Sequence, residues 1–200
     1  QKGNDKRVML MEKQIRQLFG IVPTEIEEYI LASQISQAEA DKYLIERMRV
    51  DRPYKTGILW WNLVDGWPQL SDAVVDYYYA KKLAYFYIKR SQAPFVIAAG
   101  EIEKWELPIF ACNDTLKEKQ GTFKVIDALT DEVIYEGEFT ADVNTSTLIA
   151  SIPTYYSEQK VLIFEWEIDG EKGFNHYLCG FPPIPFDMYK EILKKYKLGE

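Results

Sequence analysis

The residues of this chain that could do chemistry gather between positions 61 and 76. Three aspartates, Asp65, Asp72 and Asp76, could supply a pair of carboxyl groups for general acid–base work. Trp61 and Trp67 lie in the same stretch, and an indole offers a flat apolar face on which a sugar ring could stack. The structural reading of the same aspartates stays open, because Asp commonly orders turns and helix starts.

A buried strand is expected to position these residues. The run Gly57–Val64, GILWWNLV, is apolar except for Asn62 and shows no polar alternation, which is typical of a strand covered on both faces in a parallel sheet. Asp65-Gly66 would end the strand. Neighbouring residues on a strand point to opposite sides, so Trp61 is expected at the site and Trp60 toward a helical layer.

Helices are predicted on both sides of this strand. Pro23-Thr24 followed by Glu27 is a capping box, which predicts a helix from about Glu25 to Arg49. A second helix is predicted over Ala80–Gln92. The first helix is expected to carry a mostly solvated face made of Glu39, Asp41, Lys42 and Glu46.

From Pro94 onward the apolar period changes to two, which is typical of strands with one buried face. The predicted strands are Phe95–Ala99, Glu106–Cys112, Thr122–Leu129, Val133–Phe139, Ser146–Ile152, Val161–Ile168 and Gly173–Cys179. Their number and spacing indicate an immunoglobulin-like β-sandwich. A proline-rich stretch then precedes a short final helix, predicted from about Asp187 to Lys197.

Composition narrows the classes of function. The net charge of −7 argues against a nucleic-acid partner, which would need clustered Lys and Arg. No apolar run reaches the roughly 18 residues of a membrane span, so no membrane partner is expected. The lone His176 has no Cys or His at metal-ligand spacing, so no metal site is expected. Cys112 and Cys179 lie in apolar runs and are expected as buried thiols.

Two short patterns, Asn113-Asp114-Thr115 and Asn144-Thr145-Ser146, fit the N-glycosylation acceptor sequence. Their meaning depends on the compartment, which the sequence leaves open among periplasmic, extracellular and cytoplasmic locations.

The segment Gly57–Tyr77 resembles the last barrel strand and the following loop of glycoside hydrolase family 2, near its β-mannosidase and β-galactosidase branches. The family often has Gln at the position of Asn62 and Asn at that of Val64, so a polar contact to the sugar is absent or rearranged here. The matching positions are Gly57, Leu59, Trp61, Leu63, Asp65, Trp67, Pro68, Ser71, Asp76, Tyr77 and Lys81.

This resemblance implies the fold class and the domains. The chain is expected to be an α+β fragment, with the last helix-strand-helix part of a TIM (β/α)8 barrel followed by an immunoglobulin-like β-sandwich. The barrel segment would cover residues 1–92 and the sandwich residues 93–182. Residues 183–200 would form a C-terminal helical tail.

The resemblance also implies an activity for the intact enzyme. A retaining exo-β-glycosidase hydrolyses O-glycosidic bonds in β-galactosides or β-mannosides with two carboxyl groups and no cofactor. In the family those two glutamates lie on the fourth and seventh barrel strands, ahead of the matched region. The chain alone is therefore expected to contain no catalytic residue and to be inactive. The substrate-binding residues would be Trp61, Asn62, Asp65 and Trp67, and the partner a β-linked oligosaccharide or glycoside.

Two further readings stay open. The sandwich could be a standalone carbohydrate-binding or structural and interaction module, with an aromatic platform drawn from Trp105, Tyr155, Tyr156 and Trp166. A detached barrel strand would also expose backbone groups and apolar side chains. We expect either that the N-terminal helices fold over it, or that two chains form a homodimer through the exposed barrel remnant.

Overall fold

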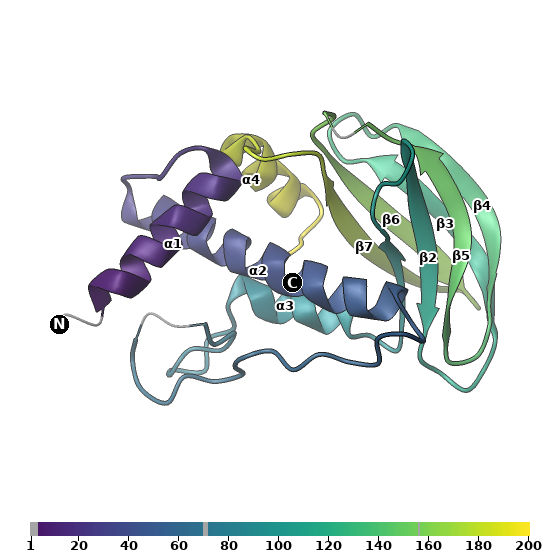
Figure 1. Cartoon of the computed structure of the whole chain (residues 1–200), viewed down its shortest axis with the longest axis horizontal. Coiled ribbons are helices and arrows are strands. Elements are labelled where there is room, and N and C mark those ends of the chain that lie inside the picture. Colours follow the sequence, from purple (N-terminus) through teal and green to yellow (C-terminus); the bar gives the residue numbers. More distant parts are fainter. Residues whose placement is uncertain (1–3, 70–71, 156) are drawn as a thin grey trace. The chain divides into compact units, whose positions relative to one another are not determined.

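The structure, a computed structural model, describes residues 4–69, 72–155 and 157–200 of the chain. Its helices are α1 (Asn4–Phe19), α2 (Ile26–Val50), α3 (Leu83–Ser91) and α4 (Phe186–Lys195) (Figure 1). Its strands are β1 (Phe95–Ala99), β2 (Glu106–Asn113), β3 (Lys119–Asp127), β4 (Val133–Ala141), β5 (Thr145–Pro153), β6 (Lys160–Ile168) and β7 (Glu171–Cys179). All seven predicted strands are therefore present, as are the three predicted helices.

The chain divides into two compact units. A helical unit comprises Gln1–Tyr43, Leu59–Lys89 and Pro182–Glu200, and a strand unit comprises Leu44–Ile58 and Arg90–Phe181. Within the described residues, no helix is both long enough and apolar enough to cross a membrane.

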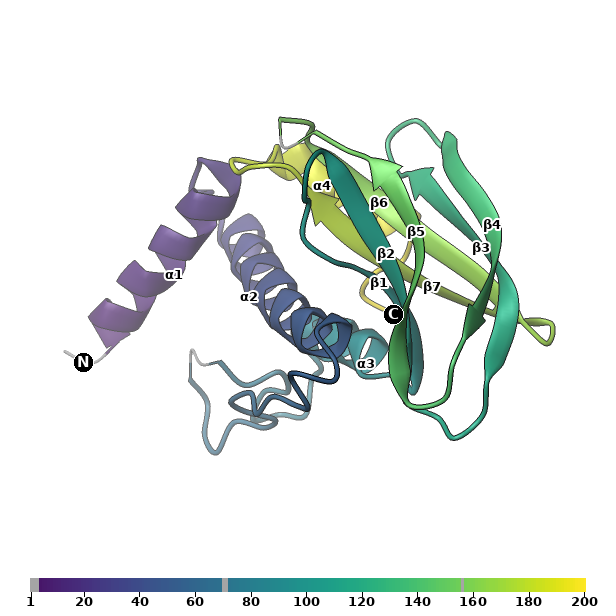
Figure 2. The ribbon, with the colours of Figure 1, turned by 45° about the vertical axis from the view of Figure 1, so that its right-hand side comes forward.

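The strand unit contains two antiparallel sheets. One has the strand order β1-β2-β5 and the other the order β4-β3-β6-β7. In Figure 2 the sheet with β2 and β5 lies in front of the sheet with β6 and β7. Because alternate side chains of each strand point to the same side, the apolar residues of both sheets face a shared interior.

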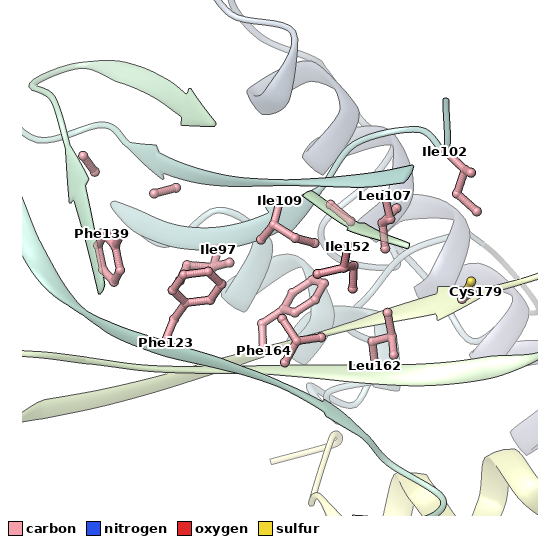
Figure 3. Close-up of a cluster of buried hydrophobic side chains, with 14 residues drawn as sticks. Ile97, Ile102, Leu107, Ile109, Phe123, Phe139, Ile152, Leu162, Phe164 and Cys179 are labelled. Atoms are coloured by element: carbon pink, nitrogen blue, oxygen red, sulfur yellow. The ribbon is translucent and has the colours of Figure 1, made fainter. Parts of the chain in front are cut away.

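The core of the strand unit is a cluster of buried apolar side chains from both sheets. Ile97 and Ile109 come from the three-stranded sheet, while Phe123, Leu162 and Phe164 come from the four-stranded sheet. Figure 3 shows these side chains pointing toward one another. Burial of this apolar surface is the main favourable contribution to the stability of the unit.

The two cysteines of the strand unit are free thiols, as expected from the sequence. Cys112 and Cys179 are both buried. Removal from water raises the pKa of the Cys112 thiol to about 11, and that of the Cys179 thiol also to about 11.

The last part of α2 belongs to the strand unit and carries a buried arginine. Arg49 donates hydrogen bonds to the backbone oxygens of Ser91 (2.6 Å), Ala93 (2.7 Å) and Cys112 (3.2 Å). Its guanidinium also pairs with Asp114 at 3.2 Å. Arg49 thus binds carbonyl groups at the end of α3, just before β1 and near the end of β2, and joins these elements.

The expected solvated face of α2 is wrong at two positions. Glu46 is only 4% exposed and Lys42 only 3%. Glu46 Oε1 accepts hydrogen bonds from Ser91 Oγ and Asn175 Nδ2, both at 2.9 Å. Glu39 and Asp41, the other two residues of the expected face, are partly exposed, so the buried part is confined to Lys42 and Glu46.

Asn113, the last residue of β2, is fully buried and ties two loops to the sheet. Its Nδ2 donates to the backbone oxygens of Lys117 (2.8 Å), Ala141 (3.2 Å) and Asp142 (3.0 Å). Its Oδ1 accepts from the backbone N–H (3.0 Å) and the hydroxyl (2.7 Å) of Thr115. The amide side chain is therefore committed to holding the fold.

The helical unit has its own core. Tyr87 and Tyr189 are fully buried, and their hydroxyls lie 2.8 Å apart. Tyr189 also donates to Glu39 Oε1, and the Phe19 and Phe186 rings lie 4.9 Å apart. Burial and the neighbouring Glu39 carboxylate raise the pKa of Tyr189 well above its ordinary value, so this hydroxyl stays protonated.

Helix α1 is not among the ranges predicted from the sequence. Its apolar residues include the continuous run 8–11, VMLM, which hides the helical period. Only Ile15 and Phe19 of this helix are buried among the residues whose burial is described.

The predicted strand at Gly57–Val64 is wrong. This segment is irregular, and its one β-bridge joins Val64 to Val75 in parallel. Leu59 is fully exposed and Trp61 is 80% exposed, so the N-terminal helices do not cover the segment as expected. A parallel strand needs neighbours along its length, and the described part of the chain supplies only this short pairing.

Candidate functional site

The segment that carries the predicted site residues lies in the helical unit and is held by a small set of backbone hydrogen bonds. Val74 N–H donates to Asn62 O (3.2 Å), and Val75 N–H donates to Leu63 O (2.9 Å). Asp65 N–H donates to Val75 O (3.1 Å). Val74 and Val75 are buried, so they form the inner support of the segment that contains residues 62–65.

Trp61 and Trp67 both present their indoles to solvent. Trp61 is 80% exposed and Trp67 is 64% exposed. The peptide bond between Trp61 and Asn62 is cis. Trp60 is only partly buried, and since the segment is not a strand, the expected alternation between Trp60 and Trp61 does not apply.

The backbone carbonyl of Asn62 accepts a hydrogen bond, whereas its side-chain oxygen accepts none among the described residues. Its Oδ1 is buried and makes no hydrogen bond among the described residues. An unsatisfied buried acceptor costs free energy that a donor from a ligand would recover. Asn62 Oδ1 is therefore a buried acceptor without a partner among the described residues, on the residue that follows the exposed Trp61 in the sequence.

Asp65 is buried and has two charged or polar partners. Its carboxylate lies 3.3 Å from Lys82 Nζ through Oδ2 and accepts from Gln69 Nε2 at 3.2 Å through Oδ1. It is 4% exposed. With one oxygen paired to a cation and the other to an amide, this carboxylate fixes the loop that carries Trp67.

Asp76 has the structural role that the sequence left open. Its Oδ1 accepts hydrogen bonds from the backbone N–H groups of Tyr78 and Ala80, each at 2.8 Å. These bonds order the turn that leads into α3.

Asp72 is exposed and pairs with Arg7 at 3.6 Å. The pKa of its neighbour Asp41 is raised to about 6, first by burial and then by the nearby Asp72 carboxylate. The three aspartates thus each have separate partners. Within the described ranges, no group of three or more His, Cys, Asp and Glu side chains could hold a metal ion.

Several residues of this region were not found from the sequence. Lys82 and Gln69 are the partners of Asp65, and no local pattern links them to it. Tyr78 and Tyr79 are 72% and 79% exposed and extend the aromatic surface of the segment. Three consecutive tyrosines, 77–79, cannot all face one core. This pattern in the sequence could have indicated that some of these rings are exposed. Ser71, one of the matched positions, lies outside the described residues.

Several fungal proteins that share the name "Beta-mannosidase B" are similar to parts of this chain. No family model matches the chain. It is 35% identical over 101 residues to "Beta-mannosidase B" of Thermothelomyces thermophilus, covering 48% of this chain and 11% of that protein. It is also 35% identical over 171 residues to "Beta-mannosidase B" of Emericella nidulans, covering 74% of this chain and 20% of that protein.

Solved structures share the fold. The β-D-mannosidase from Dictyoglomus thermophilum matches 88% of this chain and 22% of its own, with a TM-score of 0.76 and 23% identity. The Amycolatopsis orientalis exo-chitosanase CsxA matches 83% of this chain and 21% of its own, with a TM-score of 0.63 and 16% identity.

These comparisons show that the chain is similar to one part of β-mannosidases and of a related exo-acting enzyme. Its resemblance is to the C-terminal region of glycoside hydrolase family 2, and within that family to the β-mannosidases. The chain spans between about a tenth and a fifth of the length of the curated relatives that it matches.

Proposed function

We propose that this chain is the C-terminal part of a retaining exo-β-glycosidase that hydrolyses β-mannosides or β-galactosides. The names of the curated relatives favour β-mannosides. In this proposal the catalytic glutamates lie in polypeptide ahead of Gln1, so the chain contributes binding residues and no acid, base or nucleophile. The hydrolysis itself needs two carboxyl groups about 5–5.5 Å apart and no cofactor.

Residues 93–182 form the immunoglobulin-like sandwich of the proposed enzyme. The strand order supports this, because β5 pairs with β2 while β3 and β4 pair in the other sheet. The chain thus changes sheets between β2 and β3, between β4 and β5, and between β5 and β6, as Greek-key sandwiches do.

Residues 1–92 form the closing segment of the proposed barrel, and residues 183–200 form its helical tail. The order of α2, the irregular segment and α3 supports this, as does the exposure of Leu59, Trp61 and Leu63. In the intact enzyme, neighbouring barrel strands would pair with this segment and cover its apolar side chains. A second copy of the chain could cover the same side chains in a homodimer.

The observation that carries the proposal is the exposed Trp61 ring, 80% of which is accessible. The indole would stack on the apolar face of the terminal sugar, and Asn62 would accept a hydrogen bond from a sugar hydroxyl once a rotation of its side chain brings the buried Oδ1 to the surface. Asp65 positions the loop through Lys82 and Gln69, and Trp67 lines the rim of the site. Stacking and one directional hydrogen bond would orient the sugar for bond cleavage.

The first experiment is to sequence the reading frame upstream of the codon for Gln1. The proposal expects a barrel that carries an Asn-Glu pair and a second Glu. A start codon directly before Gln1 would contradict it, as would hydrolysis of an aryl β-mannoside by the 200-residue chain above the rate of its Trp61→Ala variant.

The second experiment uses the complete enzyme encoded by that frame. Trp61→Ala should lower kcat/KM for an aryl β-mannoside by about fivefold, since stacking contributes on the order of 1 kcal/mol. Tyr54→Ala, which removes an exposed ring at a different place, is the matched control and should leave kcat/KM unchanged. Equal effects of the two substitutions would remove Trp61 from the site.

A further inference from the structure

The turn between β1 and β2 holds a tryptophan in a backbone conformation that favours glycine. Glu103 and Glu106 exchange two backbone hydrogen bonds, both 2.9 Å long, around the two-residue turn Lys104-Trp105. The φ angles are 52° at Lys104 and 67° at Trp105. Two successive left-handed residues define a type I′ turn, which Asn and Gly normally fill. A bulky side chain at positive φ is strained.

Burial of the Trp105 ring contributes little stabilisation to offset this backbone strain. Trp105 is 60% exposed, and Tyr155, in the loop that follows β5, is 53% exposed. Their ring centroids lie 5.8 Å apart with an interplanar angle of 47°. Thr154 N–H donates to Trp105 O at 2.9 Å and ties the turn to this loop. Both features belong to the strand unit.

Packing therefore does not explain why this turn carries Trp. Burial stabilises a side chain in proportion to the apolar area removed from water, and most of this ring stays in water. Strained residues persist where the surrounding structure enforces them, and they gather at binding sites. Here the backbone hydrogen bonds of Glu103, Glu106 and Thr154 hold the turn in its left-handed conformation.

We propose that Trp105 and Tyr155 form a sugar-binding surface on the sandwich that stacks on the pyranose rings of a neutral β-linked oligosaccharide. Two adjacent exposed aromatic rings offer the flat apolar area that sugar rings contact. The exposed carboxylates of Glu103 and Glu106 flank the turn and would accept hydrogen bonds from sugar hydroxyls, although Glu106 Oε2 already accepts one from Ser151 at 2.9 Å. With Lys104 as the one cation of the turn, residues 103–106 carry a net negative charge, which disfavours acidic glycans. The surface belongs to the strand unit, whereas the Trp61 segment belongs to the helical unit, and this proposal does not depend on the proposed hydrolase function.

The expected platform also included Trp166 and Tyr156. Trp166 is partly buried and packs against the core of the strand unit, so it takes no part. Tyr156 lies outside the described residues. Among the described residues, the platform is therefore assigned to Trp105 and Tyr155.

The binding test uses the 200-residue chain labelled with ¹⁵N at its five tryptophans. The indole N–H signal of Trp105 is identified by its loss in Trp105→Gly. Titration with β-1,4-mannopentaose should shift that signal saturably while the Trp166 signal stays in place, and Tyr155→Ala should weaken the binding by about tenfold. No saturable shift, or an equal shift with glycerol at the same hydroxyl concentration, overturns the proposal.

A stability test separates binding from packing. Trp105→Gly relieves the strain at positive φ, so Tm should rise by about 2–4 °C while oligosaccharide binding is lost. Asp131→Gly, at another left-handed position (φ 60°) in the same unit, is the matched control and should keep full binding. A fall in Tm for Trp105→Gly would show that the ring is a packing element and would overturn the proposal.

Failure here and failure of the proposed hydrolase function are distinguishable. The oligosaccharide titration tests the sandwich alone, whereas the upstream reading frame tests for the proposed barrel. A chain that binds mannopentaose through Trp105 but has no barrel ahead of Gln1 would retain this proposal and lose the other.

Discussion

Two regions of the chain are both rich in apolar and aromatic residues, but one buries these side chains and the other exposes them to solvent. The strands of the sandwich bury theirs, with Ile97, Ile109 and Phe164 fully inaccessible. The stretch from Leu59 to Trp67 exposes most of its own, with Leu59 at 102% and Trp61 at 80%. The difference lies in the partners that the chain supplies.

Strand β6 shows what the irregular segment lacks. It pairs with β3 on one side and with β7 on the other. In the other region, Val64 makes a single bridge to Val75. Because unpaired backbone groups and uncovered apolar faces are costly, an apolar run becomes a strand only where neighbours are present. Apolar composition alone does not decide the structure.

The largest expected effect comes from removing a side chain that the sandwich buries. Phe164→Ala should lower the free energy of unfolding by about 3–5 kcal/mol, because it removes a large apolar group and leaves a cavity. Chemical denaturation monitored by circular dichroism would measure this. Leu148→Ala, at a mostly exposed position in β5, is the control and should change the free energy by less than about 0.5 kcal/mol. Similar losses in both variants would mean that the core is not where we place it.

An intermediate effect is expected from a carboxyl group in the helical unit. The pKa of Asp41 in the folded chain is about 6, above its ordinary value of 3.8, because burial and Asp72 disfavour the charged form. The folded chain therefore binds this proton more tightly than the unfolded chain does. The free energy of unfolding should fall as pH rises from about 4 to about 6 and then level off.

Asp41→Asn should remove this pH dependence and stabilise the chain at pH 7 by about 1 kcal/mol, a value reduced for solvent screening of a half-buried group. Unfolding curves at several pH values between 4 and 7.5 would test this. The control is Asp142→Asn, at an exposed loop position of the sandwich. An unchanged pH dependence in Asp41→Asn would rule out the assigned environment.

The smallest effect is expected in the exposed segment. Leu59→Ser should change the free energy of unfolding of the 200-residue chain by less than about 0.5 kcal/mol, because this side chain contributes no buried area. Denaturation at two protein concentrations would check it. A loss above about 1.5 kcal/mol that grows with protein concentration would instead show that a second copy covers Leu59.

The sandwich strands could be predicted because their partners all lie within the chain. Each strand keeps a period of two, and turn residues such as Asp169-Gly170 separate neighbours. Helix α2 was predicted from its N-terminal sequence within one residue of its start, at Ile26. These signals are local, and the chain by itself satisfies them.

The features that could not be predicted depend on contacts between residues far apart in the sequence, which no local pattern contains. The parallel partners expected for Gly57–Val64 are not supplied by the described residues. Lys42 and Glu46 are buried, and Glu46 is hydrogen-bonded to residues outside α2. For the site, Trp61, Asn62, Asp65 and Trp67 stay predictions, while the Asp65–Lys82 pair joins residues 17 positions apart. The left-handed turn at Lys104-Trp105 has no turn signal in its residue types.

The burial of the Asn113 side chain distinguishes the two N-glycosylation sequences, at Asn113 and at Asn144. Its Nδ2 is the atom to which an N-linked glycan would be attached, and it already donates to three backbone carbonyls in an inaccessible position. A glycan there is incompatible with the folded sandwich. Asn144 is exposed beyond β4, although Arg52 donates to its Oδ1 at 2.9 Å. In a secretory host, Asn144 would be the position at which the folded chain accommodates a glycan, whereas a chain modified at Asn113 could not form the hydrogen bonds described above.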